Sequence, residues 1–112
     1  MAFWLKPEST TENIIDLDGG THYIIITDGI ISAPGFVNPV IYIDGLSTNR
    51  LDTNWRHILI KTATAFEASN LTIGKRGTNF FDGLIDDVKI WNYALTDEQV
   101  KTEYNGGAVR FE

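Results

Sequence analysis

Asp-Gly pairs divide the 112-residue sequence into short segments, at residues 18–19, 28–29, 44–45 and 82–83. Aspartate and glycine tolerate the positive φ angles of tight turns, so each pair predicts a chain reversal. The segments between the pairs are rich in Ile, Val, Tyr and Thr, which suit a pleated strand. Strands are therefore predicted near residues 2–6, 13–18, 22–27, 40–44, 56–62, 70–75 and 83–92. The length fits a single domain over residues 1–112.

Two hydrophobic patterns occur in these strands. The segment 56–62 alternates, which predicts Ile58 and Ile60 on an inward face and His57 on an outward, solvated face. The run of apolar residues at 23–26 does not alternate, which indicates a strand covered on both sides. One solvated face and one covered strand together favour an antiparallel two-sheet sandwich.

A single helix is predicted near the C-terminus. Thr96 and Gln99 have the spacing of a capping box, in which each side chain bonds the other residue's backbone N–H. Leu95 and Val100 occupy the flanking apolar positions that pack together around such a start. The glycines at 106–107 can end the helix, so a short helix follows the last long strand.

The charge of the chain excludes some partners. The formal net charge is −6, the pI is about 4.7, and the nine basic residues are scattered along the sequence. Nucleic acid and anionic membranes are therefore poor partners, because both need clustered Lys and Arg. No apolar run is long enough to insert into a membrane. An acidic surface suits neutral sugars, basic peptides or a divalent cation.

The segment from Phe81 to Val100, FDGLIDDVKIWNYALTDEQV, carries a specific family resemblance. With the Y-N-G at residues 104–106, it resembles the closing strand and helix of laminin-G-like domains almost position by position. The segments FWLKP at 3–7, IYIDG at 41–45, NWRHI at 54–58 and NLTIG at 70–74 match in the family's order. The resemblance implies an all-β fold: an antiparallel two-sheet jelly-roll sandwich of the concanavalin A-like type, with one short C-terminal helix.

The resemblance also implies a place and a role. Members of this family act outside the cell or on its surface, so we expect a non-catalytic module that binds carbohydrate or glycoprotein. Family members normally begin several strands earlier than this chain does. Either the chain is a fragment, or the fold is shortened, or a second copy supplies the cover. An open sheet edge and an incompletely covered core are then expected, and a homo-oligomer would cover them.

The first candidate site is a metal site at Asp86 and Asp87. Related jelly rolls hold a structural Ca²⁺ with an aspartate on this last strand, together with ligands from elsewhere. The parity of Val88 and Ile90 places Asp86 on their inward side, where a carboxylate needs a cation or amide donors. Calcium takes six to eight oxygen ligands, so these two residues alone are insufficient. A carboxylate that caps a loop or helix is the alternative.

The second candidate is a sugar-binding surface that includes Trp4, Tyr42 and His57. Sugar sites combine an aromatic platform with polar side chains, because a pyranose stacks its C–H face on a ring. These three residues lie on strand faces opposite the apolar ones, so they could line a shared face. Core packing is the alternative for Trp4, and an ordinary surface position is the alternative for Tyr42 and His57.

The third candidate is hydrolysis, and the sequence argues against it. Glycosidases of this fold class place alternating carboxylates on one strand. Asp16 and Asp18 are the alternating acidic pair in a strand-like segment, but they run into Gly19-Gly20, which predicts a turn. The E-x-D-x-x-E pattern of jelly-roll glucanases is absent. We therefore expect no enzyme. A purely structural or oligomerisation domain and a diverged glycosidase are the alternatives to the binding module.

Overall fold

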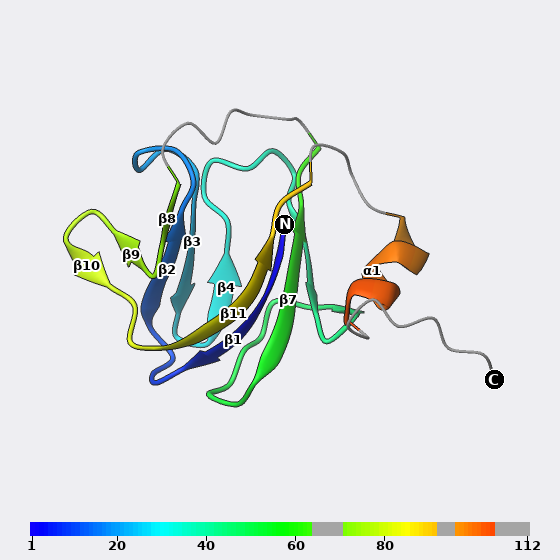
Figure 1. Ribbon diagram of the computed structural model, residues 1–112, viewed down its shortest axis with the longest axis horizontal. Coiled ribbons are helices and arrows are strands. Elements are labelled where there is room, and N and C mark those ends of the chain that lie inside the picture. The colour runs from blue at the N-terminus through cyan, green and yellow to red at the C-terminus, as the bar shows by residue number, and fades with distance from the viewer. Residues whose placement is uncertain (64–70, 92–95, 105–112) are drawn as a thin grey trace.

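The computed structural model describes residues 1–63, 71–91 and 96–104. Its strands form two main antiparallel sheets and a small hairpin, and one helix follows them (Figure 1). The elements, in chain order, are β1 (Ala2–Pro7), β2 (Glu12–Asp16), β3 (Tyr23–Thr27), β4 (Ile30–Ser32), β5 (Val40–Ile43), β6 (Leu46–Ser47), β7 (Arg56–Lys61), β8 (Thr72–Ile73), β9 (Lys75–Arg76), β10 (Asn79–Phe80), β11 (Gly83–Lys89) and α1 (Asp97–Tyr104).

The two sheets lie face to face as a β-sandwich. The first sheet has five strands in the order β11-β1-β7-β5-β6, and the second has four in the order β4-β3-β2-β8. The remaining pair, β9 and β10, forms a separate hairpin beside β2. This mostly β, antiparallel architecture with one short helix is consistent with the concanavalin A-like sandwich predicted from the sequence.

The core lies between the two sheets and is covered within one chain. From the first sheet, Phe3, Leu5 and Ile58 are fully buried in it. Alternate residues of β3, Ile24 and Ile26, close it from the second sheet. The prediction of an incompletely covered core is therefore wrong for the described residues, because β2, β3 and β4 supply the second layer. Among the described strands, β6 and β11 end the first sheet and β8 ends the second, each with a paired strand on one side, whereas residues 49–51 lie along the outer side of β4.

The predicted capping box is confirmed. The backbone N–H of Gln99 donates to Thr96 Oγ1 at 3.2 Å, and the backbone N–H of Thr96 donates to Gln99 Oε1 at 2.8 Å. The predicted apolar partner Leu95 and the glycines at 106–107 lie outside the described residues. Among the residues described, no helix is both long and apolar enough to cross a membrane.

Helix α1 lies against the face of the five-stranded sheet that points away from the second sheet (Figure 1). We call this the outer face of the sheet. The buried side chain of Val100 packs there against Ala2 and Leu59, with Tyr42 and Trp91 at the margin of the cluster. The five-stranded sheet is therefore covered on both faces where α1 lies.

A β-bulge in β11 reverses the predicted direction of Asp86. Ala2 pairs with Lys89 and Trp4 with Asp86, so the register shifts between these two pairs. Asp87 sits at the shift with a φ of 52°, in the left-handed region. An extra residue inverts the alternation of inward and outward side chains. Asp86 is consequently exposed on the outer face, and the prediction that it shares the inward side of Val88 is wrong.

Candidate functional site

The outer face brings together two of the three residues predicted to bind a sugar. Trp4 lies directly opposite His57 in the register of β1 and β7, and their ring centroids are 5.1 Å apart. Tyr104 of α1 contacts both rings, with centroids 5.9 Å from Trp4 and 5.8 Å from His57. The chain's own helix therefore occupies the part of the face where a sugar ring was expected to stack.

His57 is buried, which contradicts its predicted position on a solvated face. Its side of β7 is apolar because Leu59, two residues on, also packs under α1. Burial lowers the pKa of the His57 imidazole below its ordinary value, more than the nearby carboxylates of Glu103 and Asp44 raise it. A neutral, covered imidazole is poorly placed to hydrogen-bond an external ligand.

Tyr42 is the member of the predicted trio that lies beside the helix rather than beneath it. It pairs with Leu59 in the register of β5 and β7, and it is half-buried. The ammonium of Lys61 lies 5.4 Å from the centroid of its ring. Trp4 is also only partly covered. Nothing in these contacts tests whether Trp4, Tyr42 or His57 binds a ligand, so that role stays a prediction.

The predicted metal residues Asp86 and Asp87 are exposed side chains at the bulge of β11. Asp86 Oδ1 accepts a hydrogen bond from the backbone N–H of Asp87 at 2.8 Å, and Asp87 Oδ2 lies 3.8 Å from Lys89 Nζ. Within the described part of the chain, no group of three or more His, Cys, Asp or Glu side chains could hold a metal ion. These contacts resemble the loop-capping alternative, while calcium itself stays untested.

A pocket of about 370 Å³ opens at one end of the sandwich, within the size range of small-molecule sites (roughly 300–1,000 Å³). We call it the corner pocket. It is built where the β5–β6 hairpin, the following loop and the start of β7 meet. Its lining residues are Ile43, Asp44, Leu46, Thr48, Arg50, Leu51, Asp52 and Arg56.

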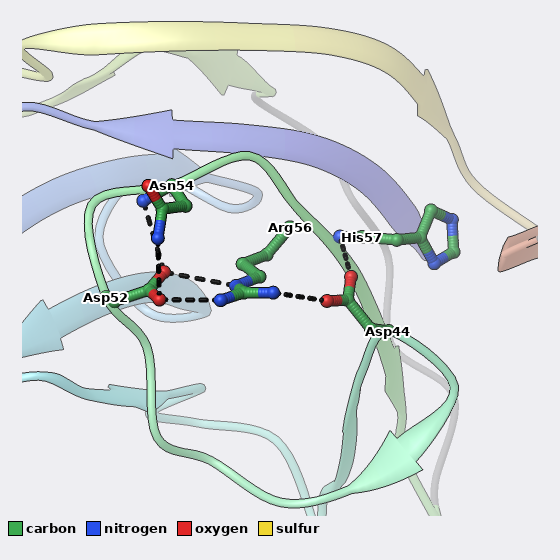
Figure 2. Close-up of polar contacts among 5 residues, drawn as sticks. All are labelled: Asp44, Asp52, Asn54, Arg56 and His57. Atoms are coloured by element: carbon green, nitrogen blue, oxygen red, sulfur yellow. Dashed lines mark hydrogen bonds and ion pairs between the residues drawn. The ribbon is translucent and has the colours of Figure 1, made fainter.

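Two carboxylates hold the guanidinium of Arg56 at the wall of the corner pocket (Figure 2). Its Nε and Nη2 donate to the two oxygens of Asp52 at 3.1 and 2.6 Å, a bidentate pair. Its Nη1 donates to Asp44 Oδ2 at 3.0 Å. Such fork-shaped pairs are the strongest and most directional of side-chain hydrogen bonds. Arg56 is therefore fixed in one orientation, although it is partly exposed.

The oxygens of Asp52 are saturated by this arrangement. In addition to the two bonds from Arg56, Oδ1 accepts from the backbone N–H of Asn54 at 3.1 Å, and Oδ2 accepts from the Asn54 side chain at 3.0 Å. A carboxylate has about four acceptor positions. The hydrogen bond from Arg56 holds the pKa of Asp52 far below its usual range, and the hydrogen bond from Asp52 raises the pKa of Arg56 in turn. Both groups stay charged at any ordinary pH.

Asp44 connects the corner pocket to the outer face. Asp44 and Gly45 both have positive φ angles, 52° and 79°, as the two-residue turn between β5 and β6 requires. Asp44 Oδ1 accepts from the backbone N–H of His57 at 2.8 Å, while its Oδ2 binds Arg56 (Figure 2). A Cβ at Gly45 would lie 3.4 Å from the Tyr104 ring, so Tyr104 packs directly over this turn.

The loop that forms the floor of the corner pocket is attached to the second sheet. The backbone N–H of Leu51 donates to the carbonyl of Gly29 at 2.7 Å, and Arg50 forms an isolated bridge with Ile30 of β4. Gly29 has a φ of 79°, and a Cβ there would lie 3.3 Å from the Leu51 carbonyl oxygen. The residues that line the corner pocket thus lie on the first sheet and on this loop, and the loop is joined to the second sheet by hydrogen bonds.

Sequence reasoning missed the corner pocket. The acidic pair that it did consider, Asp16 and Asp18, forms the predicted turn: Asp16 Oδ1 accepts from the backbone N–H groups of Asp18 and Gly20 at 3.2 and 2.8 Å. The available signal was Asp52 and Arg56, an acid and a base four residues apart beside an Asp-Gly turn. This spacing alone does not predict a site, because the second carboxylate that binds Arg56 is Asp44, eight or more residues earlier in the sequence.

Comparison with known families gives one finding. A laminin G family described as the "Concanavalin A-like lectin/glucanases superfamily" matches residues 37–101, which is more than half of the chain and includes every residue that lines the corner pocket. Searches of curated proteins and of solved structures returned no significant match. The fold and the matched segment agree, and the chain therefore belongs to this laminin G family of concanavalin A-like domains.

Proposed function

We propose that the chain is a non-catalytic module that recognises carbohydrate, free or on a glycoprotein, through the corner pocket. Family membership supports a binding role in general, because domains of this family are generally not enzymes. The observation that carries the carbohydrate proposal is the fixed guanidinium of Arg56 beside the apolar side chains of Leu46 and Leu51. Oriented polar groups next to an apolar surface suit a ring that has hydroxyls on its edge and C–H groups on its face.

The pocket is better suited to this role than the aromatic outer face. Tyr104 covers the rings of Trp4 and His57, whereas Leu46 at the rim of the corner pocket is 69% exposed. A ligand can enter the pocket without any displacement of the helix. Family membership likewise supports a location outside the cell or at its surface, and we include that in the proposal.

Two matched substitutions test which surface binds. Leu46→Ser removes an exposed apolar side chain from the corner pocket, and Leu84→Ser removes one of similar exposure from the outer face of β11. On a glycan array, we expect Leu46→Ser to weaken binding about tenfold and Leu84→Ser to leave it unchanged. Tyr42→Ala serves as a third variant for the site predicted from the sequence. Loss of binding in Tyr42→Ala alone would move the site to the outer face.

A structural role through self-association is the second candidate, and one observation favours it. Leu71, Ile73 and Phe80, on or beside the edge strand β8 and the β9–β10 hairpin, are 42%, 47% and 72% exposed. An open edge with apolar side chains is a template for pairing with a second copy. Sedimentation of wild type and Ile73→Lys across a concentration series tests this: a dimer that the charge abolishes supports assembly, and a monomer throughout contradicts it.

Calcium is tested separately by thermal melting with added Ca²⁺ and with EDTA. A cation that binds only the folded state raises the melting temperature, and the rise grows with the logarithm of the cation concentration above its Kd. If Asp86 and Asp87 hold calcium, the shift should disappear in the double variant Asp86→Asn, Asp87→Asn. No shift in the wild type would contradict the calcium prediction.

A further inference from the structure

The hydrogen-bonding capacity that remains free in the corner pocket belongs mainly to donors. Asp52 has no acceptor position left, because Arg56 and Asn54 use all of them. Arg56 has five N–H groups, of which three are used, so two are left for a ligand. Of the two carboxylates that line the pocket, Asp52 is thus already paired with a cation and saturated, and Asp44 is paired with the same guanidinium.

Arg50 is a second arginine among the residues that line the same pocket. Its backbone is fixed by the bridge to Ile30. Among the residues that the structure describes, no hydrogen bond or ion pair involves the Arg50 guanidinium. The backbone N–H of Arg50 donates to Thr48 Oγ1 at 3.5 Å. No residue in the described part of the chain therefore uses any of the five N–H groups of this guanidinium, and all five can bind a ligand.

Acceptor capacity in the pocket is small by comparison. Asp44 keeps about two acceptor positions after its bonds to His57 and Arg56, and Thr48 contributes one hydroxyl. A neutral sugar presents hydroxyls that need donors and acceptors in similar numbers. A carboxylate presents acceptors only, and its planar fork matches a guanidinium in bidentate geometry.

The geometry points to a carboxylate-bearing sugar as the ligand of the corner pocket, with Arg50 as the residue that reads the carboxylate. This inference rests on the proposed carbohydrate-binding function and names its ligand class. The sugar ring packs on Leu46 and Leu51 at the apolar side of the pocket, and its carboxylate pairs with Arg50 on the loop. Arg56, fixed by its two aspartates, donates its remaining N–H groups to a ring hydroxyl or to the same carboxylate.

Pairs of sugars that differ only at C6 test the inference. Galacturonate is compared with galactose, and glucuronate with glucose, each titrated into the wild-type protein at low salt and followed by NMR shifts of backbone and arginine side-chain N–H signals. Of the two acidic sugars, we expect the one that binds more tightly to have a Kd about tenfold or more below that of its neutral partner. This difference in affinity is the one expected of a charge-assisted contact. The preference should shrink as salt is added.

Arg50→Gln removes the charge from an exposed side chain and should abolish the preference while leaving the melting temperature unchanged. Lys101→Gln, on the exposed side of α1, removes an equal charge outside the pocket and should change nothing. Equal binding of acid and neutral sugar would overturn the acidic class and leave the proposed function standing. An acid preference that survives Arg50→Gln would overturn the role of Arg50. Binding of a glutamate-containing peptide but of no sugar would overturn both proposals.

Discussion

The outer face and the corner pocket both adjoin the Asp44-Gly45 turn, but the outer face is covered by α1 and the corner pocket is open. Tyr104 packs over Gly45 and covers Trp4 and His57, whereas Asp44, the other residue of the turn, directs Arg56 toward an open pocket. Arg56 and His57 are consecutive residues of β7, yet Arg56 lines the open pocket and His57 is buried under α1. The aromatic face is satisfied by the chain itself, and the polar corner is the one left available. Aromatic content alone is therefore a poor guide to which face of this chain is accessible.

The largest effect on stability is expected from a substitution that changes the outer face and leaves the corner pocket intact. Tyr104→Ala removes the ring that covers Trp4 and His57, and we expect it to lower the free energy of unfolding by about 2 kcal/mol, since the ring is half-buried and makes two aromatic contacts. Chemical denaturation measures this, and tryptophan emission should shift to longer wavelength. Sugar binding at the corner pocket should be unchanged. If binding falls with stability, the two regions are not independent.

A smaller effect should reach both regions at once. Asp44→Asn keeps a side chain that tolerates the positive φ at this position and an oxygen for the His57 N–H, but it removes the charge that faces Arg56. We expect a loss of about 1 kcal/mol, because the charged guanidinium of Arg56 then donates to a neutral amide oxygen instead of a carboxylate. NMR shifts of both the Arg56 side chain and the His57 amide should change. Shifts confined to one side would show that the turn does not link them.

The pH dependence of stability tests whether the His57 imidazole is buried on the outer face. The unfolded chain protonates His57 near its ordinary pKa of 6.5, while burial lowers the pKa in the folded state. Between these two values the unfolded chain binds more protons, so the free energy of unfolding should fall as the pH drops below about 6.5 and should level off below the folded pKa. His57→Gln should abolish this contribution. An unchanged pH profile in that variant would contradict the burial of the imidazole.

The smallest effect concerns the ion pair that attaches α1 to β11. Lys89 Nζ lies 3.0 Å from Glu103 Oε2, and this hydrogen bond raises the pKa of Lys89. The pair is partly exposed, so Glu103→Gln should change stability by no more than about 0.5 kcal/mol. Because Glu103 also raises the pKa of His57, the same variant should lower the pKa of that imidazole in an NMR titration. A rise would mean that the helix lies differently on the sheet.

The parts of the fold that depend on neighbouring residues were predictable from the sequence. The Asp28-Gly29 and Asp44-Gly45 pairs both adopt positive φ angles in hairpin turns, and the Thr96–Gln99 capping box forms as its spacing indicates. In each case the signal and the structure lie within a few residues of each other, so tertiary packing had little opportunity to override them.

The candidate sites were less predictable because they depend on contacts between distant segments. The direction of Asp86 is inverted by a bulge whose cause is not visible in the local pattern, and His57 is covered by a helix that begins some forty residues later. Arg50 reaches the pocket because its loop is bonded to a turn twenty residues earlier in the sequence. The short strands β4, β6, β9 and β10 were also missed, since two or three residues carry too little periodicity.

The attachment of Leu51 to Gly29 joins the loop of the corner pocket to the second sheet, so the interior of the sandwich influences the shape of the pocket. Arg50 is bridged to Ile30 of β4 in the second sheet, whereas Arg56 lies on β7 of the first, so the packing between the sheets bears on how these two residues lie. A substitution in the core such as Ile31→Val should therefore change the shape of the corner pocket without altering any residue that lines it. The binding proposed for the corner pocket should thus also respond to substitutions at buried positions.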